Sequence, residues 1–136
     1  MKKRVVVCAG TFDHFHRGHL SYLDQAKRLG DELIVIVARD ETVNRIKGFF
    51  PTDDEQVRLS NVENTGIPFK VMLGNSGADI FRIIEDLKPD VIALGYDQRV
   101  SDKTIMERFP SCSVVRLESF HPHTYKSSFF RKKKGC

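Results

Sequence analysis

Two histidines three residues apart are the side chains in this sequence best placed to do chemistry. His16 and His19 stand on either side of Gly18, in a segment that reads Gly-Thr-Phe-Asp-His-Phe-His-Arg-Gly-His-Leu over residues 10–20. An apolar run precedes the segment and helically spaced apolar residues follow it, which predicts a strand, a turn and a helix that begins near Arg17. Because residues three apart share one side of a helix, both imidazoles can face the same spot at its first turn.

That spot suits phosphate. A helix N-terminus offers free backbone N–H groups and the positive end of the helix dipole, and Gly18 leaves the backbone open to a ligand. Histidine donors can stabilise charge that develops on phosphorus-bound oxygens, and with reactants held in line they can supply most of the catalysis of phosphoryl-type transfer. The sequence has no apparent Ser/His/Asp or Cys/His arrangement, so we expect direct displacement without a covalent intermediate.

Strand-like and helix-like segments alternate along the chain, and together they predict an α/β fold. Short apolar runs predict five strands, over residues 4–9, 33–38, 69–73, 91–94 and 113–117. Helical spacing predicts helices over residues 17–29, 41–47, about 54–63, 78–87 and 104–109. Because strands separated by helices imply right-handed crossovers, we expect one Rossmann-like, doubly wound, open parallel sheet of five strands. The chain, residues 1–136, is expected to form a single domain.

Smaller signals concern the ends and the buried sides of these helices. Gly30 is expected to end the first helix as its C′ residue. The apolar positions expected in the third helix are Val57, Leu59 and Val62.

The loops that follow the expected strands should meet at one edge of the sheet. Open parallel sheets bind ligands at the carboxyl ends of their strands, where the strand order reverses. The segments expected at this edge are residues 10–16, 39–40, 95–97 and 121–128. The histidine pair would therefore share a site with residues that are far away in sequence.

The Gly-Thr-Phe-Asp and His-Arg-Gly-His segments resemble the signature of the cytidylyltransferase-like nucleotidyltransferases. Chain length, the expected strand order and a serine pair, Ser127 and Ser128, before the last expected helix fit the same family. The resemblance implies an α/β enzyme that moves a nucleoside monophosphate from a triphosphate onto a phosphate-bearing acceptor and releases pyrophosphate. It also implies a divalent cation such as Mg²⁺ on the triphosphate, held by phosphate oxygens and water and not by a metal site of the protein.

The resemblance assigns roles to individual positions. His16 and His19 resemble the histidines that stabilise the pentavalent α-phosphorus and would be catalytic. The other positions that resemble nucleotide-binding residues are Thr11, Phe12, Arg17, Gly18, Lys47, Asp97, Tyr125, Ser127 and Ser128. Among these, Lys47 resembles a lysine that reaches the phosphates, although an ordinary solvated lysine fits equally well. The serine pair resembles hydroxyls that hold the β- and γ-phosphates, a role compatible with simple helix capping.

The substrates are expected from resemblance to one branch of the family. Residues 30–43 and 93–98 resemble the archaeal FAD synthases, which transfer AMP from ATP to FMN. Residues 123–128 lack the Arg-Thr-Glu-Gly-Ile-Ser segment of glycerol-3-phosphate cytidylyltransferases, which weakens CTP as the donor; Tyr125 could line the base or ribose site instead. The alternatives are such a cytidylyltransferase, an adenylyltransferase for pantetheine phosphate or a heptose phosphate, and, in a different class, a non-catalytic nucleotide-binding protein.

Composition limits the class of protein, its cellular compartment and its partners. The chain is 40% hydrophobic and 29% charged with a net charge of +4, which is typical of a globular protein, and no apolar stretch approaches the roughly 20 residues of a membrane span. Three cysteines without metal-ligand spacing favour a reducing cytoplasm. The basic run 131–134 is expected to be a solvated helix end and not a nucleic-acid arm. Resemblance to the family further suggests a homodimer.

Overall fold

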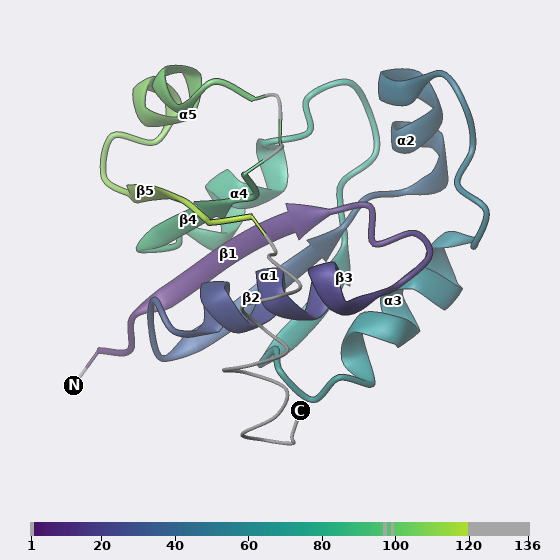
Figure 1. The fold of residues 1–136 in the computed structure, drawn as a ribbon. Coiled ribbons are helices and arrows are strands. Elements are labelled where there is room, and N and C mark those ends of the chain that lie inside the picture. The colour runs from purple at the N-terminus through teal and green to yellow at the C-terminus, as the bar shows by residue number, and fades with distance from the viewer. Residues whose placement is uncertain (1, 97, 99, 120–136) are drawn as a thin grey trace.

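A five-stranded parallel sheet forms the centre of the computed structural model, which describes residues 2–96, 98 and 100–119 (Figure 1). Its strands are β1 (Val5–Gly10), β2 (Glu32–Val37), β3 (Lys70–Leu73), β4 (Val91–Leu94) and β5 (Ser113–Arg116). The strand order is β3-β2-β1-β4-β5, and every neighbouring pair is parallel. The predicted Rossmann-like, doubly wound sheet is thereby confirmed.

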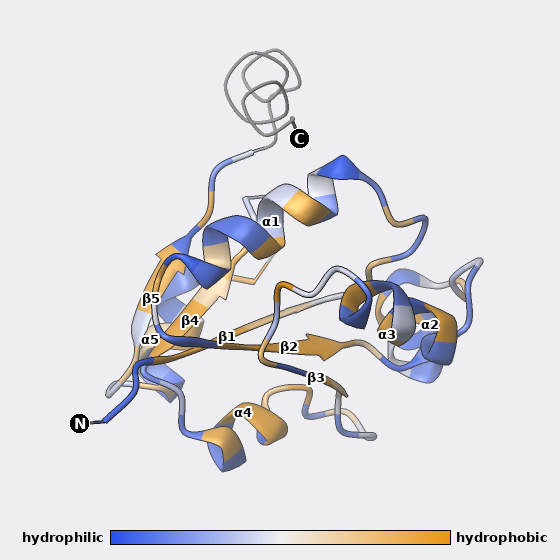
Figure 2. Ribbon diagram, turned by 90° about the horizontal axis from the view of Figure 1, so that it is seen from below, coloured by the Kyte–Doolittle hydropathy of each residue, from blue (hydrophilic) through white to orange (hydrophobic). Residues whose placement is uncertain are grey.

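Helices cover both faces of the sheet. They are α1 (Arg17–Lys27), α2 (Asp40–Lys47), α3 (Glu55–Glu63), α4 (Arg82–Leu87) and α5 (Asp102–Arg108). Leu23 of α1 and Val62 of α3 belong to the core on one face, whereas Ile84 of α4 and Ile105 of α5 belong to the core on the other. Figure 2 shows α1 and α4 on opposite sides of the sheet. No helix of the described residues is long and apolar enough to cross a membrane.

The strand order reverses beside β1, and this creates the crevice that positions the site. From β1 the chain moves outward to β2 and β3, and it then returns to place β4 on the other side of β1. Each residue of β1 pairs with β2, from Val5 opposite Glu32 to Gly10 opposite Val37. The carboxyl end of β1 therefore lies between the loops that leave β2 and β4, as expected for a ligand site in a doubly wound sheet.

Gly30 does not have the role predicted for it. Helix α1 ends at Lys27 with a right-handed cap at Arg28, and Gly30 lies outside the left-handed region. Its backbone instead approaches the first strand closely: a Cβ at this position would lie 2.7 Å from the carbonyl oxygen of Arg4 and 2.8 Å from Cγ2 of Val6. Glycine is needed here because the turn into β2 leaves no room for a side chain.

The fourth helix begins four residues later than predicted, because side chains bond the backbone of the preceding segment. Asn75 Oδ1 accepts a hydrogen bond from the Ile83 amide at 3.0 Å, and Asn75 Nδ2 donates to the Asp79 carbonyl at 2.7 Å. Asp79 Oδ1 accepts from the Phe81 amide at 3.2 Å. Local side-chain bonds of this kind compete with helix formation, so α4 starts only at Arg82.

The predicted buried side of α3 is also partly wrong. Val57 is 45% exposed, whereas the neighbouring Arg58 is 0% exposed and takes the buried position. The reason is that the buried guanidinium has polar partners: it bonds three backbone carbonyl oxygens and the carboxylate of Asp40.

Candidate active site

A cleft of about 1180 Å³ opens at the carboxyl ends of β1, β2 and β4. In Figure 1 these strand ends lie between α2 on one side and α5 on the other. The predicted site residues that line the cleft are Thr11, Phe12, His16, Gly18, His19 and Lys47. Five of these residues belong to the segment that runs from the end of β1 into the first turn of α1, and the sixth comes from the end of α2.

The two histidines form a reciprocal cap at the start of α1. His16 is the N-cap residue, and its Nδ1 accepts a hydrogen bond from the Gly18 amide at 3.0 Å. In return, the His16 amide donates to Nδ1 of His19 at 3.1 Å. This is the geometry of a capping box in which both side chains are imidazoles. The local backbone therefore fixes the orientation of both rings.

The same bonds define which ring nitrogen of each histidine can donate. A neutral imidazole has one N–H donor and one acceptor nitrogen, and in both rings Nδ1 is the acceptor. The proton of each neutral ring is thus assigned to Nε2. The rings are stacked with 4.0 Å between their centroids, and both line the cleft. The pair can present two N–H donors to one anionic group.

The aromatic rings of Phe12 and Phe15 pack against the His19 ring. The Phe15 ring stacks on His19 with 5.1 Å between centroids, and the Phe12 ring lies 5.5 Å from it. Phe12 is 2% exposed and has a φ of 58°, an unusual value for a residue with a bulky side chain. Its side chain belongs to the core while its backbone turns beside the cleft, so surrounding packing holds this strained conformation in place.

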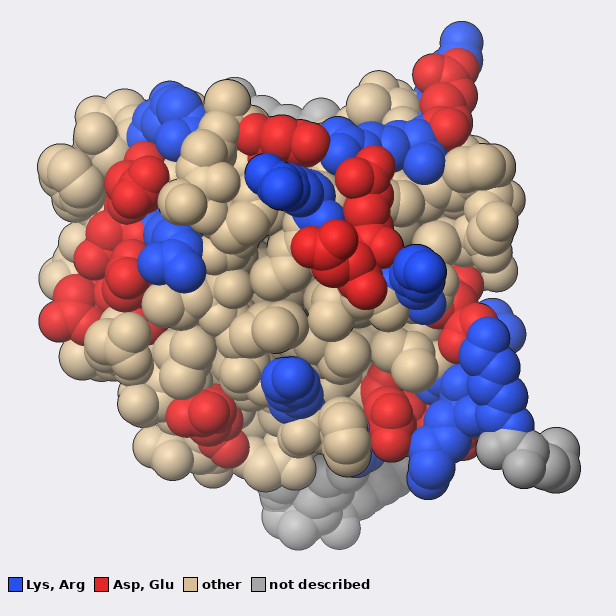
Figure 3. Space-filling view, turned by 180° about the vertical axis from the view of Figure 1, so that it is seen from behind, with Lys and Arg blue, Asp and Glu red and all other residues tan. Residues whose placement is uncertain are grey.

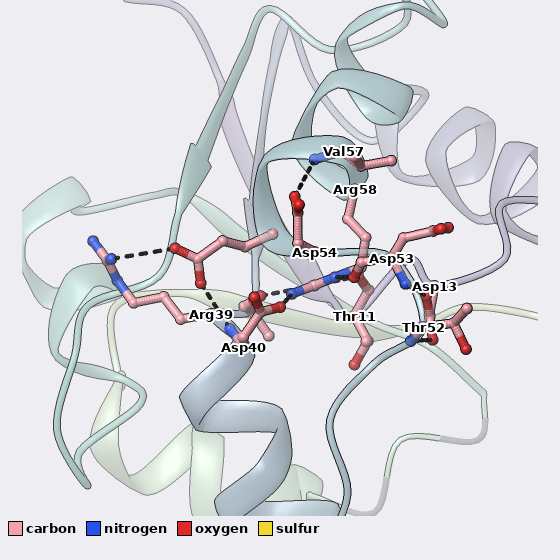
Figure 4. Close-up of polar contacts among 11 residues, drawn as sticks. Thr11, Asp13, Arg39, Asp40, Thr52, Asp53, Asp54, Val57 and Arg58 are labelled. Carbon is pink, nitrogen blue, oxygen red and sulfur yellow. Dashed lines mark hydrogen bonds and ion pairs between the residues drawn. The ribbon is translucent and has the colours of Figure 1, made fainter.

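Arg58, which the sequence analysis missed, holds the loops around the cleft together (Figure 4). Its guanidinium donates to the carbonyl oxygens of Thr11 and Ala38, each at 2.8 Å, and to that of Asp53 at 2.9 Å. It also forms an ion pair with Asp40 at 2.6 Å. The loops after β1 and β2 are thereby joined to the start of α3. The available signal was its spacing, because Arg58 precedes the buried Val62 by four residues and shares its helix face.

Asp13 adds a second tie between the histidine segment and the loop before α3. Its carboxylate accepts hydrogen bonds from the backbone amides of Thr52 and Asp53 at 2.8 and 2.9 Å. Burial by itself would raise the pKa of Asp13, but these amide bonds, with the charges of His14 and Arg58, hold it below its ordinary value. Asp13 is therefore a structural carboxylate that stays ionised near neutral pH.

Other predicted site residues are placed differently. Arg17 is the first residue of α1, has an exposed side chain and is not among the residues that line the cleft. Asp97, Tyr125, Ser127 and Ser128 lie outside the described residues. Within residues 2–96, 98 and 100–119, no group of three or more His, Cys, Asp or Glu side chains is placed to hold a metal ion.

Comparison with known proteins finds similarity along most of this chain and not only around the cleft. A family model described as cytidylyltransferase-like matches residues 7–132. A curated relative from Thermoplasma volcanium named FAD synthase is 36% identical over 132 residues, which cover 94% of this chain and 92% of the relative. One of the same name from Archaeoglobus profundus is 44% identical over 128 residues, covering 90% and 80%. A crystal structure from T. volcanium, described as a lipopolysaccharide core biosynthesis protein, matches with a TM-score of 0.83 and 35% identity, over 88% of this chain and 100% of that one.

Proposed function

Because the chain belongs to the cytidylyltransferase-like family, we propose that it joins ATP and FMN to give FAD and pyrophosphate. It is a nucleotidyltransferase, and the similarity to proteins named FAD synthase over nearly their whole length supports FMN as the acceptor. The observation that carries the proposal is the reciprocal cap of His16 and His19, which uses both Nδ1 atoms as acceptors and leaves Nε2–H as the donor of two rings that line a cleft at the reversal point of the sheet. Such a site fits a phosphorus centre that gains negative charge during the reaction.

The reaction is a direct displacement at the α-phosphorus of ATP. A phosphate oxygen of FMN attacks this atom, the bond to the bridging oxygen of the β-phosphate breaks, and pyrophosphate leaves with that electron pair. His16 and His19 donate hydrogen bonds to the oxygens on the α-phosphorus as their charge grows, and the N-terminus of α1 adds a favourable dipole. The divalent cation enters with ATP as part of the substrate and is held by phosphate oxygens and water.

The remaining contacts are assigned by position. Lys47 lines the cleft at the end of α2, where its ammonium would bind phosphate oxygens. The backbone of Thr11 and Phe12, together with Gly18, borders the place that the triphosphate would occupy. Arg17 has an exposed position beside the histidine pair, so a nucleotide contact from it stays a prediction. The same holds for the four predicted positions outside the described residues.

Other parts of the proposal concern the whole protein. We expect residues 1–136 to act as one catalytic domain, working in the cytoplasm and pairing as a homodimer.

Product analysis tests the proposed reaction. Purified protein is incubated with Mg²⁺, FMN and each nucleoside triphosphate in turn, and the flavin dinucleotide formed is identified by chromatography. FAD is expected with ATP, and a variant that carries both His16→Asn and His19→Gln is the control against contaminating enzymes. If no triphosphate gives a flavin dinucleotide, FMN is not the acceptor. Pyrophosphate release with glycerol 3-phosphate, pantetheine phosphate or a heptose phosphate would then identify the acceptor class within the same family reaction.

A further inference from the structure

Arg116 connects the last strand of the sheet to the connection between β4 and α5. One terminal nitrogen of its guanidinium donates to the carbonyl oxygens of Gly95 and Gln98, at 2.6 and 2.9 Å. The other donates to the carbonyl of Val100 at 2.9 Å and to the carboxylate of Asp102. A single side chain thus bonds the connection at its start, its middle and its end.

A second side chain ties the same connection to the histidine segment. Gln98 Oε1 accepts from the Gly95 amide at 2.7 Å, and Gln98 Nε2 donates to the carbonyl of Ala9 at 3.0 Å. That carbonyl also accepts from the Tyr22 hydroxyl of α1 at 2.8 Å. The connection is therefore held by Arg116 from β5. Through the end of β1 it is joined to α1, the helix that His16 caps and that contains His19.

The held segment forms one wall of the cleft. Gly95, Tyr96, Gln98 and Val100 all line it, as does Lys47 at the end of α2. In an in-line displacement the attacking oxygen of the acceptor and the leaving pyrophosphate lie on opposite sides of the α-phosphorus. Dinucleotides bind a doubly wound sheet across the crevice where the strand order reverses, here between β1 and β4. The wall after β4 therefore fits the nucleoside half of the donor.

We propose that Arg116 is a positioning residue that sets the affinity for the nucleoside triphosphate by holding the β4–α5 connection in the shape of this wall. The choice of ATP as the ligand rests on the proposed function. Arg116 is not itself among the residues that line the cleft, so it acts through the carbonyls that it orders. A connection without these bonds would have to be ordered by the nucleotide, and the free energy of ordering would be taken from binding.

Arginine is suited to this role by its shape. Its planar guanidinium presents several N–H donors in a fixed fork, so it can bond acceptors in three directions at once. A lysine at the same position keeps the charge but offers a single donor atom. Arg116→Lys is therefore expected to retain only part of the effect, and Arg116→Met to lose all of it.

Kinetics and direct binding test the proposal together. We expect Arg116→Met to raise the KM for ATP roughly tenfold or more, with kcat at saturating ATP within about twofold and the KM for FMN unchanged. Arg116→Lys should give an intermediate KM, and it takes the place of Arg116→Met if that variant does not fold. Calorimetric titration with Mg²⁺ and ATP, without FMN, should show the same loss of affinity. This titration does not depend on the acceptor, so a failure of FMN as substrate leaves it valid.

Arg108 provides a matched control. Its side chain is 29% exposed, as is that of Arg116, and it is bonded to Asp79 at 2.7 Å and Glu85 at 3.0 Å. These contacts join α5 to α4 and its preceding turn, on a face where basic and acidic side chains lie interspersed (Figure 3). Arg108→Met should leave ATP affinity unchanged.

Three results would overturn the proposal. The first is unaltered ATP binding in a folded Arg116 variant. The second is a fall in kcat with KM for ATP unchanged, because this would place the effect on the chemical step. The third is an equal rise in KM in the Arg108 and Arg116 variants, because general loosening would then explain both.

Discussion

At the scale of single residues, His16 and His19 combine a structural role with the proposed chemical one. Each Nδ1 accepts a hydrogen bond from a backbone amide at the start of α1, and each Nε2 is the donor assigned to phosphate. Because the helix cap fixes the rings before a substrate arrives, little reorganisation is needed when charge develops on phosphorus-bound oxygens. A substitution by alanine would remove both roles together, so it cannot separate stability from catalysis.

Variants that keep the cap can separate the two roles. Asparagine is a good N-cap residue and glutamine is a usual partner in a capping box, so His16→Asn and His19→Gln should unfold in urea near the wild-type midpoint. Each should lower kcat by roughly 10²–10³-fold, with a much smaller change in the KM for ATP, because a transition-state donor is lost. Steady-state kinetics with ATP and FMN measures this. Equal losses in affinity and in rate would indicate a binding role instead.

His16→Ala tells how much the cap itself contributes. Its free energy of unfolding should be about 1 kcal/mol lower than that of His16→Asn, and its kcat should be similar. A large difference in kcat between these two folded variants would mean that cap geometry, and not the missing Nε2–H, governs turnover.

At the scale of elements, Arg58 determines how the loops after β1 and β2 meet the start of α3. Its guanidinium is completely buried and bonds three carbonyl oxygens and one carboxylate. Arg58→Met should lower the free energy of unfolding by about 3 kcal/mol or more, because these acceptors would lose their donor inside the protein. Urea unfolding measures the change. Arg28→Met, which removes a surface ion pair with Asp24, should change stability by less than about 1 kcal/mol.

A comparable loss in the two variants would contradict this interpretation of Arg58. In that case the buried bonds of Arg58 would contribute no more than a surface ion pair whose arginine side chain is 65% exposed.

Gly30, in the turn before β2, and Gly48, the C-cap of α2, should respond to substitution by alanine for different reasons. At Gly30 the added Cβ meets a backbone carbonyl at 2.7 Å, so Gly30→Ala forces the turn and the first strand apart and should cost about 1–3 kcal/mol. At Gly48 nothing lies within 4 Å of the added Cβ, but φ is +86°. Gly48→Ala should therefore cost about 1 kcal/mol from backbone strain alone. Thermal and urea unfolding compare them, and a smaller loss at Gly30 than at Gly48 would contradict the close approach.

At the scale of the whole molecule, the reactivity of the Cys8 thiol depends on whether the sheet is folded. It lies in the central strand, is 1% exposed and belongs to the core under α1 and α3. Burial raises the pKa of its thiol to about 12, against a smaller opposing effect of a hydrogen bond with Tyr22. The reactive thiolate is thus scarce at neutral pH, and a reagent can reach the sulfur only when the fold opens.

Thiol labelling can use this property to detect ligand binding. In a variant with Cys112→Ser and Cys136→Ser, Cys8 should be modified only at the rate of global opening, and Mg²⁺ with ATP should slow the modification because the ligand stabilises the folded state. A variant that keeps only Cys112, which is half-buried, should react faster. Fast labelling of Cys8 that is insensitive to ATP would show that the sheet opens locally without loss of the site.

Signals of local period and spacing were sufficient to predict the framework and the meeting of the two histidine rings at the start of α1. Five apolar runs separated by helical segments predicted the parallel sheet, since strands and helices repeat over a few residues and leave that repeat in the sequence. The spacing of His16 and His19 likewise predicted that both rings meet at one helix start, which the structure confirms at 4.0 Å between centroids. These features depend on neighbours along the chain.

Contacts between distant segments were decided only by the tertiary structure. Arg58 bonds Thr11, 47 residues away, and Arg116 bonds Gly95, 21 residues away, and neither partner could be identified before the strands were placed side by side. Gly30 is required by the nearby backbone of Arg4 and not by the conformation of its own helix. The sequence by itself therefore determined the elements and the placement of the histidine pair at the start of α1. Packing decided which buried arginine and which loop anchors hold the cleft around them, because such partners are chosen by proximity in space and leave no periodic trace in the chain.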